Sequence, residues 1–270
     1  MRRVALKIAY LGTDYHGFQR QPNLTTVEGE ILSALDETGV VADVNKCGFG
    51  VAGRTDRGVP SLGNVITFLT EEEVRINQLN NALPKSIRVL AQAKVPLHFK
   101  VRYALNRHYR YLLPLVPGDV YPDLNKMVGA AELIQGTHDF TNFSKKSDRN
   151  PVRTIDVVEV AKRGDLIQVD VLGESFLWNM VRKIVSVLLT VGRGELPVDI
   201  INEFFKPEMD LCIMPMTPEG LILMKINYSG IKFDEDPYAV KTFKSFLKHE
   251  YLTKEAIALS QREMIENLKD

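Results

Sequence analysis

The stretch Gly53-Arg-Thr-Asp-Arg-Gly-Val59 places one aspartate between two arginines, with a glycine on either side of that group. Arg54 and Asp56 are two positions apart, so in extended backbone both side chains point to the same face. A carboxylate beside a guanidinium keeps its negative charge, which suits it to attack an electron-poor carbon or to stabilise positive charge. An aspartate that holds a turn, with both arginines in water, also explains these residues. The stretch is therefore either a catalytic loop or an ordinary turn.

A helix is predicted over Leu177–Val191, because apolar residues recur there at i, i+3, i+4 and i+7. A helix with so wide an apolar face is largely buried. Arg182 lies on the remaining polar stripe. An arginine on a buried helix either extends its charged end to water or meets a carboxylate, and periodicity alone leaves both alternatives open. Asp56 is the carboxylate that we consider as its partner.

Basic and aromatic residues alternate in a third cluster, Arg102-Tyr-Ala-Leu-Asn-Arg-His-Tyr-Arg-Tyr111. Arginines can contact phosphates, and tyrosine rings can stack on exposed bases. In a strand over Arg107–Val116, the two tyrosines point to one face, while His108 and Arg110 point to the other. The pattern fits an RNA-binding strand and an ordinary half-buried strand equally well.

The composition is that of a globular protein, with 45% hydrophobic and 25% charged residues among 270. A chain of this length buries roughly three quarters of its unfolded surface, so it needs neither a disulfide nor a metal to hold a core. Intrinsic disorder, collagen and a coiled-coil rod are excluded. No apolar run reaches the roughly 20 residues of a membrane span. Lys7 and Asp14 interrupt the segment that a signal peptide would need, so we expect a cytoplasmic protein.

Charge is unevenly distributed along a chain that is neutral overall. Residues 1–110 hold 15 basic and 10 acidic side chains, a net charge of +5, and the remainder has a net charge of −5. A basic first part favours a polyanionic partner if its charges share one face. A solvated surface without any partner explains the same numbers.

The sequence does not support zinc binding or dinucleotide binding. Cys47 and Cys212 lie far apart without a CxxC partner, so we expect buried, reduced thiols and no zinc site. Gly48-Phe-Gly-Val-Ala-Gly53 matches the dinucleotide-binding pattern G-x-G-x-x-G. In such a site the glycines open a helix, but Gly58 and Pro60 prevent a helix here. We therefore expect no nucleotide cofactor.

The order of the expected elements favours an α+β fold with mostly antiparallel sheets, because several strands follow each other without a helix between them. Thr25 and Glu28 have capping-box spacing before the first helix. The similar mix in each half suggests two related lobes, residues 1–104 and 105–270. We expect strands at Val4–Leu11, Val40–Val44, Asn64–Leu69, Ile87–Val95, Tyr109–Val116, Val152–Ala161, Leu166–Leu172 and Leu221–Ile226. We expect helices at Val27–Glu37, Glu72–Ala82, Tyr121–Ile134, Leu177–Val191, Val198–Phe205 and Thr253–Leu268.

Together these segments resemble the TruA family of tRNA pseudouridine synthases. The glycine-flanked aspartate stretch is the most specific match, and the other matches stand in family order between about residues 4 and 226. They are Tyr10-Leu-Gly-Thr-Asp-Tyr-His-Gly-Phe-Gln-Arg-Gln21, Thr26-Val27-Glu28, Arg107-His-Tyr-Arg-Tyr111, Asp139-Phe-Thr-Asn-Phe143, Pro151-Val-Arg-Thr-Ile155, Met180-Val-Arg-Lys-Ile184 and Glu219-Gly-Leu221.

The resemblance implies the pseudouridine synthase fold, in which two lobes flank a central cleft. It implies isomerisation of uridine to pseudouridine in the anticodon stem-loop of tRNA, at positions 38–40, by a homodimer without cofactor or metal. Asp56, on the first lobe, matches the essential aspartate. Tyr109 matches a tyrosine that stacks on the substrate, and Arg54 and Arg182 match arginines around the aspartate. We further expect RNA contacts from Arg57, Arg102 and Arg110.

Three features depart from the family pattern. Leu11 replaces an aspartate, and Pro60-Ser61 replaces His-Ala after the aspartate stretch, which puts the exit of that loop in question. The helical extension at about 231–270 lies outside the match and receives no role. Two other functions also fit part of the sequence: a non-catalytic RNA-binding protein, and a sugar-bond hydrolase. A hydrolase usually needs two carboxylates, and only Asp56 has a convincing setting.

Overall fold

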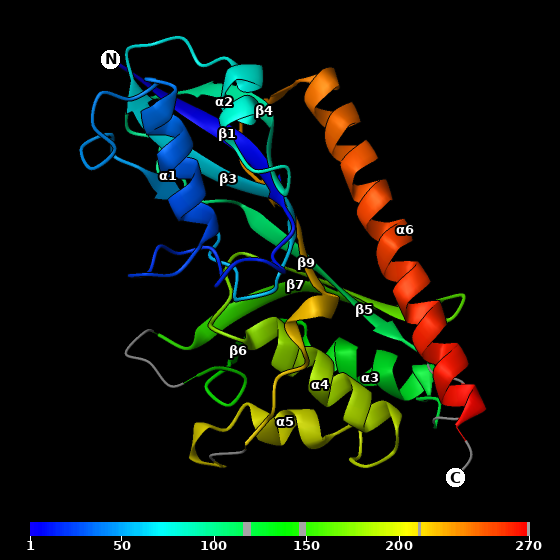
Figure 1. Ribbon diagram of the computed structural model, residues 1–270. Coiled ribbons are helices and arrows are strands. Elements are labelled where there is room, and N and C mark those ends of the chain that lie inside the picture. Colours follow the sequence, from blue (N-terminus) through cyan, green and yellow to red (C-terminus); the bar gives the residue numbers. More distant parts are fainter. Residues whose placement is uncertain (116–119, 146–149, 210–211, 269–270) are drawn as a thin grey trace.

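The computed structural model describes residues 1–115, 120–145, 150–209 and 212–268. Within these residues the chain forms ten strands and six α-helices (Figure 1). The strands are β1 (Arg2–Tyr10), β2 (Gly50–Val51), β3 (Ser61–Thr70), β4 (Ile87–Val95), β5 (Asn106–Pro114), β6 (Gly136–Asp139), β7 (Val152–Arg163), β8 (Leu166–Gly173), β9 (Leu221–Asn227) and β10 (Asp234–Glu235). The helices are α1 (Val27–Glu37), α2 (Ile76–Ala82), α3 (Leu124–Ile134), α4 (Met180–Gly192), α5 (Ile200–Phe204) and α6 (Pro237–Asn267).

All ten strands belong to one sheet. Its order is β10-β4-β1-β3-β9-β5-β8-β7-β6, and β2 pairs with β3 from outside this row. Neighbouring strands in the described residues run antiparallel, with one exception: β3 and β9 pair in parallel, through Ser61 and Leu223. The predicted α+β class with mostly antiparallel strands is therefore confirmed. The strands of the two halves form one continuous sheet because β9 pairs with both β3 and β5.

Helices cover the two ends of the sheet with separate hydrophobic cores. Near the N-terminus, alternate β1 residues such as Leu6 and Ile8 pack against α1 and α2. In the second half, β5 and β8 pack against α3 and α4, and this core includes Tyr109 and Val171. Figure 1 shows α1 and α2 beside the first strands, and α3, α4 and α5 beside the later ones. None of the described helices is long and apolar enough to span a membrane.

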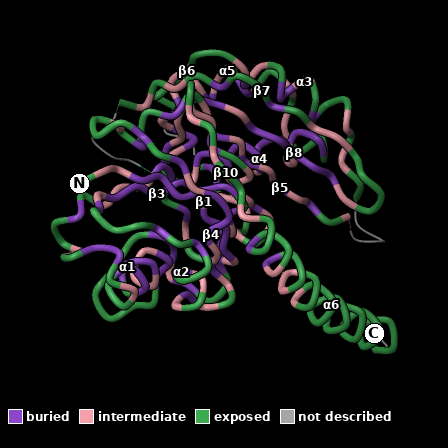
Figure 2. Tube along the Cα trace, turned by 90° about the horizontal axis from the view of Figure 1, so that it is seen from above, coloured by how far each residue is buried: buried purple, intermediate pink, exposed green. Residues whose placement is uncertain are grey.

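The segment after residue 230 returns to the first strands. β10 pairs with β4, and Phe243 of α6 packs against Ala9 and Leu90. From residue 251 to the end of α6 at Asn267 every side chain is exposed, and Figure 2 shows this part of the helix projecting from the molecule. The division into lobes at 1–104 and 105–270 stays a prediction.

Elements with strong local signals have the predicted bounds. α1 and β4 begin and end at the expected residues, and β7 and β8 form the expected hairpin, which turns at Gly164 with a φ of 59°. The residues Val40–Val44 were predicted to form a strand, and this prediction is wrong. They form turns in which Val40 and Val41 are buried, so the apolar run reflects burial and not strand pairing.

The predicted helix starts were less accurate. Thr26, and not Thr25, caps α1: its hydroxyl accepts from the Gly29 amide at 3.2 Å, while Glu28 accepts from the Arg20 amide. The expected starts at Glu72, Tyr121, Leu177 and Val198 shift to Ile76, Leu124, Met180 and Ile200. α6 begins sixteen residues earlier than predicted, at Pro237, where Asp236 caps it by accepting from the Ala239 amide.

Two smaller predictions also need comment. Cys47 is buried and free, as expected, but Cys212 is exposed, so its predicted burial is wrong. It follows two residues outside the described range and lies in an irregular segment after α5, where no core covers it. Val116, the expected end of the fifth strand, also lies outside the described residues.

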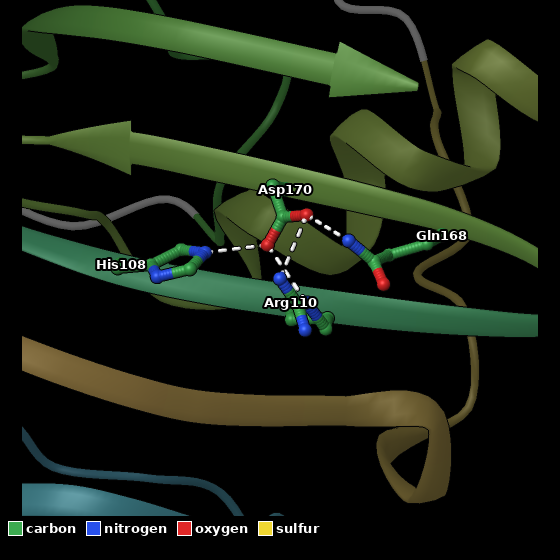
Figure 3. Close-up of polar contacts among 4 residues, drawn as sticks. All are labelled: His108, Arg110, Gln168 and Asp170. Atoms are coloured by element: carbon green, nitrogen blue, oxygen red, sulfur yellow. Dashed lines mark hydrogen bonds and ion pairs between the residues drawn. The ribbon is translucent and has the colours of Figure 1, made fainter. Parts of the chain in front are cut away.

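A buried polar cluster joins β5 to β8 on the face of β5 opposite its tyrosines (Figure 3). Asp170 accepts hydrogen bonds from His108, from Gln168 and from the Arg110 guanidinium, whose Nε and Nη2 lie 2.9 and 3.2 Å away. Burial alone would raise the pKa of Asp170, but the hydrogen bonds from Arg110, His108 and Gln168 lower it below its usual value. The cluster therefore stabilises the strand pair as long as the carboxylate is charged.

We expect Asp170→Asn to lower the free energy of unfolding by about 1–3 kcal/mol near neutral pH, because the mutant leaves Arg110 without its charged acceptor. Since the folded-state pKa of Asp170 is lowered, the stabilisation is present above the unfolded-state pKa and is lost as pH falls through the folded-state value. Urea unfolding should show a difference from wild type that shrinks below about pH 4. The exposed cross-strand neighbour Glu159, changed to Gln, is the control and should show no such pattern.

Candidate active site

The aspartate loop, residues 53–59, lies between β2 and β3, and side chains of both halves hold its start. The Asn64 side chain accepts from the Gly53 amide at 3.2 Å and donates to the Gly53 carbonyl at 2.7 Å. The buried Arg107 guanidinium donates to the Ala52 carbonyl at 3.0 Å. The start of the loop is therefore fixed to β3 and to β5.

The opening segment of the chain holds the middle of the loop. The Phe18 amide donates to the Thr55 carbonyl at 3.0 Å, and the hydroxyls of Tyr10 and Thr55 lie 2.9 Å apart. Burial raises the pKa of Tyr10 to about 12, so its hydroxyl keeps its proton. A Cβ at Gly12 would lie 2.3 Å from the Val59 carbonyl oxygen, so this contact requires glycine. The motif that starts at Tyr10 thus shapes the aspartate loop.

The exit of the loop is well ordered despite its departure from the family pattern. The Pro60 carbonyl accepts from the Leu223 amide at 3.1 Å. The Ser61 hydroxyl donates to the Leu223 carbonyl at 3.1 Å and accepts from the Asn64 amide at 3.0 Å. Pro60 and Ser61 therefore start the parallel contact between β3 and β9 that joins the two halves of the sheet.

Arg182 meets Asp56 across the two halves. Its Nη1 donates to Asp56 Oδ2 at 3.2 Å and to Asn179 Oδ1 at 3.0 Å, and its Nε donates to the Met216 carbonyl at 2.5 Å. The Arg182 side chain is 14% exposed and that of Asp56 is 30% exposed. Of the two alternatives left open by the sequence, the structure shows a carboxylate partner.

Tyr109 lies in the same region, on the face of β5 that packs against α4. The residue is 8% exposed, and its ring lies edge-on to Phe176 with centroids 5.1 Å apart. Burial is the main cause that raises the pKa of Tyr109 well above its usual value; Tyr10 and Asp56 raise it less, and Arg107 lowers it. The tyrosine is therefore a neutral, buried ring close to the carboxylate.

The remaining predicted arginines differ in setting. Arg54, Arg57 and Arg102 are exposed, and their side chains make no hydrogen bond or ion pair with any described residue. Arg110 is bound to Asp170 on the opposite face of β5 from Tyr109. The structure thus brings together Asp56, Arg182 and Tyr109. The other predicted arginines either extend into solvent or, in the case of Arg110, bind Asp170 away from this site.

Sequence reasoning missed the residues that hold the loop. Arg107 donates to the carbonyls of Ala52, Arg102 and Glu174, and is 7% exposed. Its position in the basic and aromatic cluster suggested RNA contact, and only the three-dimensional structure shows that it is internal. Asn64 gave no signal, because an asparagine inside a strand has no typical role.

The described residues include no group of three or more histidine, cysteine, aspartate or glutamate side chains that could hold a metal ion.

The chain is similar in sequence to known proteins over its whole length. The sequence pattern of a family described as tRNA pseudouridine synthase matches residues 130–229. A protein of Methanothermobacter thermautotrophicus named tRNA pseudouridine synthase A is 49% identical over 271 residues, which cover 100% of this chain and 98% of that protein. The chain belongs to the family of tRNA pseudouridine synthases.

A second synthase of the same name, from Methanosphaera stadtmanae, is 45% identical and covers 100% of both chains. Among solved structures, a Cbf5-Nop10-Gar1 complex matches 69% of this chain and 45% of that chain, with 16% identity and a TM-score of 0.35. At that score it supports no argument. Synthases of this family isomerise uridine to pseudouridine in tRNA, and the chain is an isomerase of this class.

We expect Arg182→Lys to lower kcat of this synthase by about 100-fold, because a lysine cannot bond Asp56, Asn179 and the Met216 carbonyl together. KM for tRNA should stay near the wild-type value, since Arg182 acts through Asp56. Steady-state kinetics on a tRNA transcript separates the two parameters. Arg193→Lys, at the exposed end of the same helix, is the control. A raised KM with an unchanged kcat would show that Arg182 binds RNA instead.

Proposed function

We propose that Asp56 is the catalytic carboxylate with which this isomerase converts uridine to pseudouridine in the anticodon arm of tRNA. The observation that carries the proposal is the ion pair of Asp56 with Arg182, at 3.2 Å. This ion pair holds the Asp56 carboxylate in a fixed, partly exposed position between the two halves of the sheet. Tyr109 pairs in the sheet with Leu223, whose amide donates to the Pro60 carbonyl at the exit of the loop that carries Asp56.

The reaction needs a negative charge beside the sugar. The bond between C1′ and N1 of uridine breaks and leaves its electron pair on N1, uracil rotates while bound, and a bond forms between C1′ and C5; the C5 proton is lost and N1 takes up a proton. Breaking the first bond develops positive charge at C1′. The Asp56 carboxylate can serve by attacking C1′, by stabilising this charge or by removing the C2′ proton. All three roles need its oxygens close to the C1′–C2′ side of the sugar.

The neighbouring side chains suit a flipped nucleotide. A base that undergoes chemistry must leave the stack, and an aromatic ring can receive it. We assign this contact to Tyr109, whose neutral ring is preorganised by Phe176. Arg54 and Arg57 flank Asp56 and extend into solvent without partners among the described residues, so they are free to meet backbone phosphates. Arg102 offers a further phosphate contact, and an RNA contact by Arg110 stays a prediction.

The finer parts of the function rest on the family resemblance. We propose that the target uridines are those at positions 38–40 of tRNA and that the enzyme works in the cytoplasm without cofactor or metal. The chemistry described above rearranges bonds within one nucleotide and needs no oxidant, reductant or activated group, which is consistent with a protein acting alone on tRNA.

We also propose that the enzyme is a homodimer and that the distal part of α6, residues 251–267, forms part of the interface. Ile257 and Met264 follow Phe243 at multiples of seven residues, so they extend the buried face of α6 into solvent. In the first half of this helix lysines outnumber the single glutamate, Glu250, and in the second half three glutamates outnumber Lys254 and Arg262. Antiparallel pairing with a second copy would bring opposite charges together at Lys241, Lys244, Lys248, Glu255, Glu263 and Glu266.

Asp56→Asn keeps the size of the side chain and removes its charge, so we expect no detectable isomerisation while tRNA binding persists. Tritium released from [5-³H]uridine-labelled tRNA measures the reaction, because the C5 proton leaves in every turnover. Asp165→Asn, in the exposed turn between β7 and β8, should retain full activity. Wild-type activity in the Asp56 variant would end the proposal.

Ile257→Glu should convert the dimer into a monomer, because the substitution places a charge in the apolar stripe of the interface. Sedimentation equilibrium gives the molecular mass directly. The control is Leu259→Glu, which changes an exposed apolar residue on the opposite side of the same helix and should leave the dimer intact. A wild-type protein that is monomeric at micromolar concentration would contradict this assignment.

A further inference from the structure

An open pocket of about 730 Å³ lies beside the start of the aspartate loop, between the segments 96–105 and 228–231. Its size suits one nucleotide, since pockets for small ligands span roughly 300–1,000 Å³. Its lining includes none of the motif residues that carry the family resemblance and none of the residues in the catalytic proposal. The pocket therefore stands apart from the site formed by Asp56, Arg182 and Tyr109.

Three aromatic rings and one lysine contribute to a lining that is otherwise mostly apolar. The Tyr103 residue is 75% exposed, and the Lys100 Nζ lies 5.5 Å from the centroid of its ring. Phe99 and Tyr228 form the inner wall, with ring centroids 5.2 Å apart. His98 is exposed on the same rim. A ring left in solvent beside a cation offers a face on which a nucleobase can stack.

The charge around the pocket favours a polyanion. From residue 74 to residue 118 the sequence contains eight Lys and Arg and no Asp or Glu. The described lining contains one cationic side chain, Lys100, and no acidic side chain. The same stretch includes Arg102, whose exposed side chain has no partner among the described residues. An acidic protein surface would also suit these charges, but it would not use the exposed ring as well.

The pocket is attached rigidly to the catalytic loop. The Arg107 guanidinium donates both to the Arg102 carbonyl, at 2.8 Å, and to the Ala52 carbonyl, at 3.0 Å. The Tyr228 hydroxyl donates to the Val101 carbonyl. Val101 and Ala104 are buried, so the turn that presents Tyr103 is fixed on both sides. A ligand held on this ring would therefore have a defined position relative to Asp56.

We propose that this pocket binds a second, unpaired nucleotide of the tRNA substrate, with its base stacked on Tyr103 and its phosphate held by Lys100 and Arg102. The occupant is single-stranded because bases inside a duplex do not expose their faces to protein rings. The site positions the tRNA and takes no part in the chemistry. This inference rests on the proposed function, which supplies the RNA ligand.

The test is direct binding of a tRNA transcript, measured by fluorescence anisotropy at several salt concentrations. Tyr103→Ala should weaken binding about tenfold, and this loss should be the same at every salt concentration, because stacking is not ionic. Tyr103→Phe should bind like wild type. Lys100→Ala should lower the slope of log affinity against log salt by about one. For a blunt RNA duplex without unpaired bases, Tyr103→Ala should bind like wild type.

Tyr121 is a matched control, since it is also an exposed tyrosine with a lysine, Lys162, 5.8 Å from its ring centroid. Tyr121→Ala should bind tRNA like wild type. Equal tRNA affinity of Tyr103→Ala and wild type would overturn the inference, as would an equal loss on the blunt duplex. At saturating tRNA, kcat of Tyr103→Ala should be unchanged, and a fall in kcat would assign Tyr103 to the catalytic site instead.

These outcomes are separable from a failure of the proposed function. A wild-type protein that binds tRNA without tritium release would refute the role of Asp56 but would leave the Tyr103 binding result intact. An active enzyme whose affinity is unaffected by Tyr103→Ala would refute the pocket alone.

Discussion

The ion pair between Asp56 and Arg182 is the contact on which the site depends, because its partners come from opposite halves of the sheet. Asp56 follows β2, while Arg182 belongs to α4, which packs beneath β5 and β8. The pair can exist only if the halves keep a fixed relation. The contact of β3 with β9 maintains it, through Ser61 and Leu223. A carboxylate on a loop thereby gains a position as defined as one on a strand.

Arg107 has a comparable role on the other side of the loop. Its guanidinium connects the start of the aspartate loop, the strand that carries Tyr109 and the turn at Arg102. One buried cation with three carbonyl acceptors thus ties the loop that carries Asp56 to the strand that carries Tyr109. Burying such a charge is costly unless its donors are bonded, and here backbone carbonyls accept four hydrogen bonds from the guanidinium. The arrangement explains why an arginine in a basic, aromatic cluster points inward.

Local signals in the sequence predicted much of the fold and part of the site. α1 and β4 have strong periodicity and clear ends, so their bounds were right, whereas the apolar run at Val40–Val44 reports only burial. The aspartate stretch and the helix of Arg182 were both identified. Their contact joins residues 126 positions apart, however, and periodicity cannot choose a partner at that distance. Asn64 and the inward direction of Arg107 depend on tertiary packing and had no local signal.

The place of β9 in the sheet has a consequence for biosynthesis. Translation delivers the first 220 residues before the strand that links β3 to β5, so the core of α1, α2 and β1 can form before β9 connects the two halves, whereas the second core is completed by Leu221, Leu223 and Ile226 of β9 itself. The last segments, β10 and α6, then close on β4, one of the earliest strands. Such pairings between distant parts of a polypeptide have high contact order and form slowly. A nascent chain still on the ribosome therefore lacks the fixed relation between Asp56 and Arg182 until β9 has emerged.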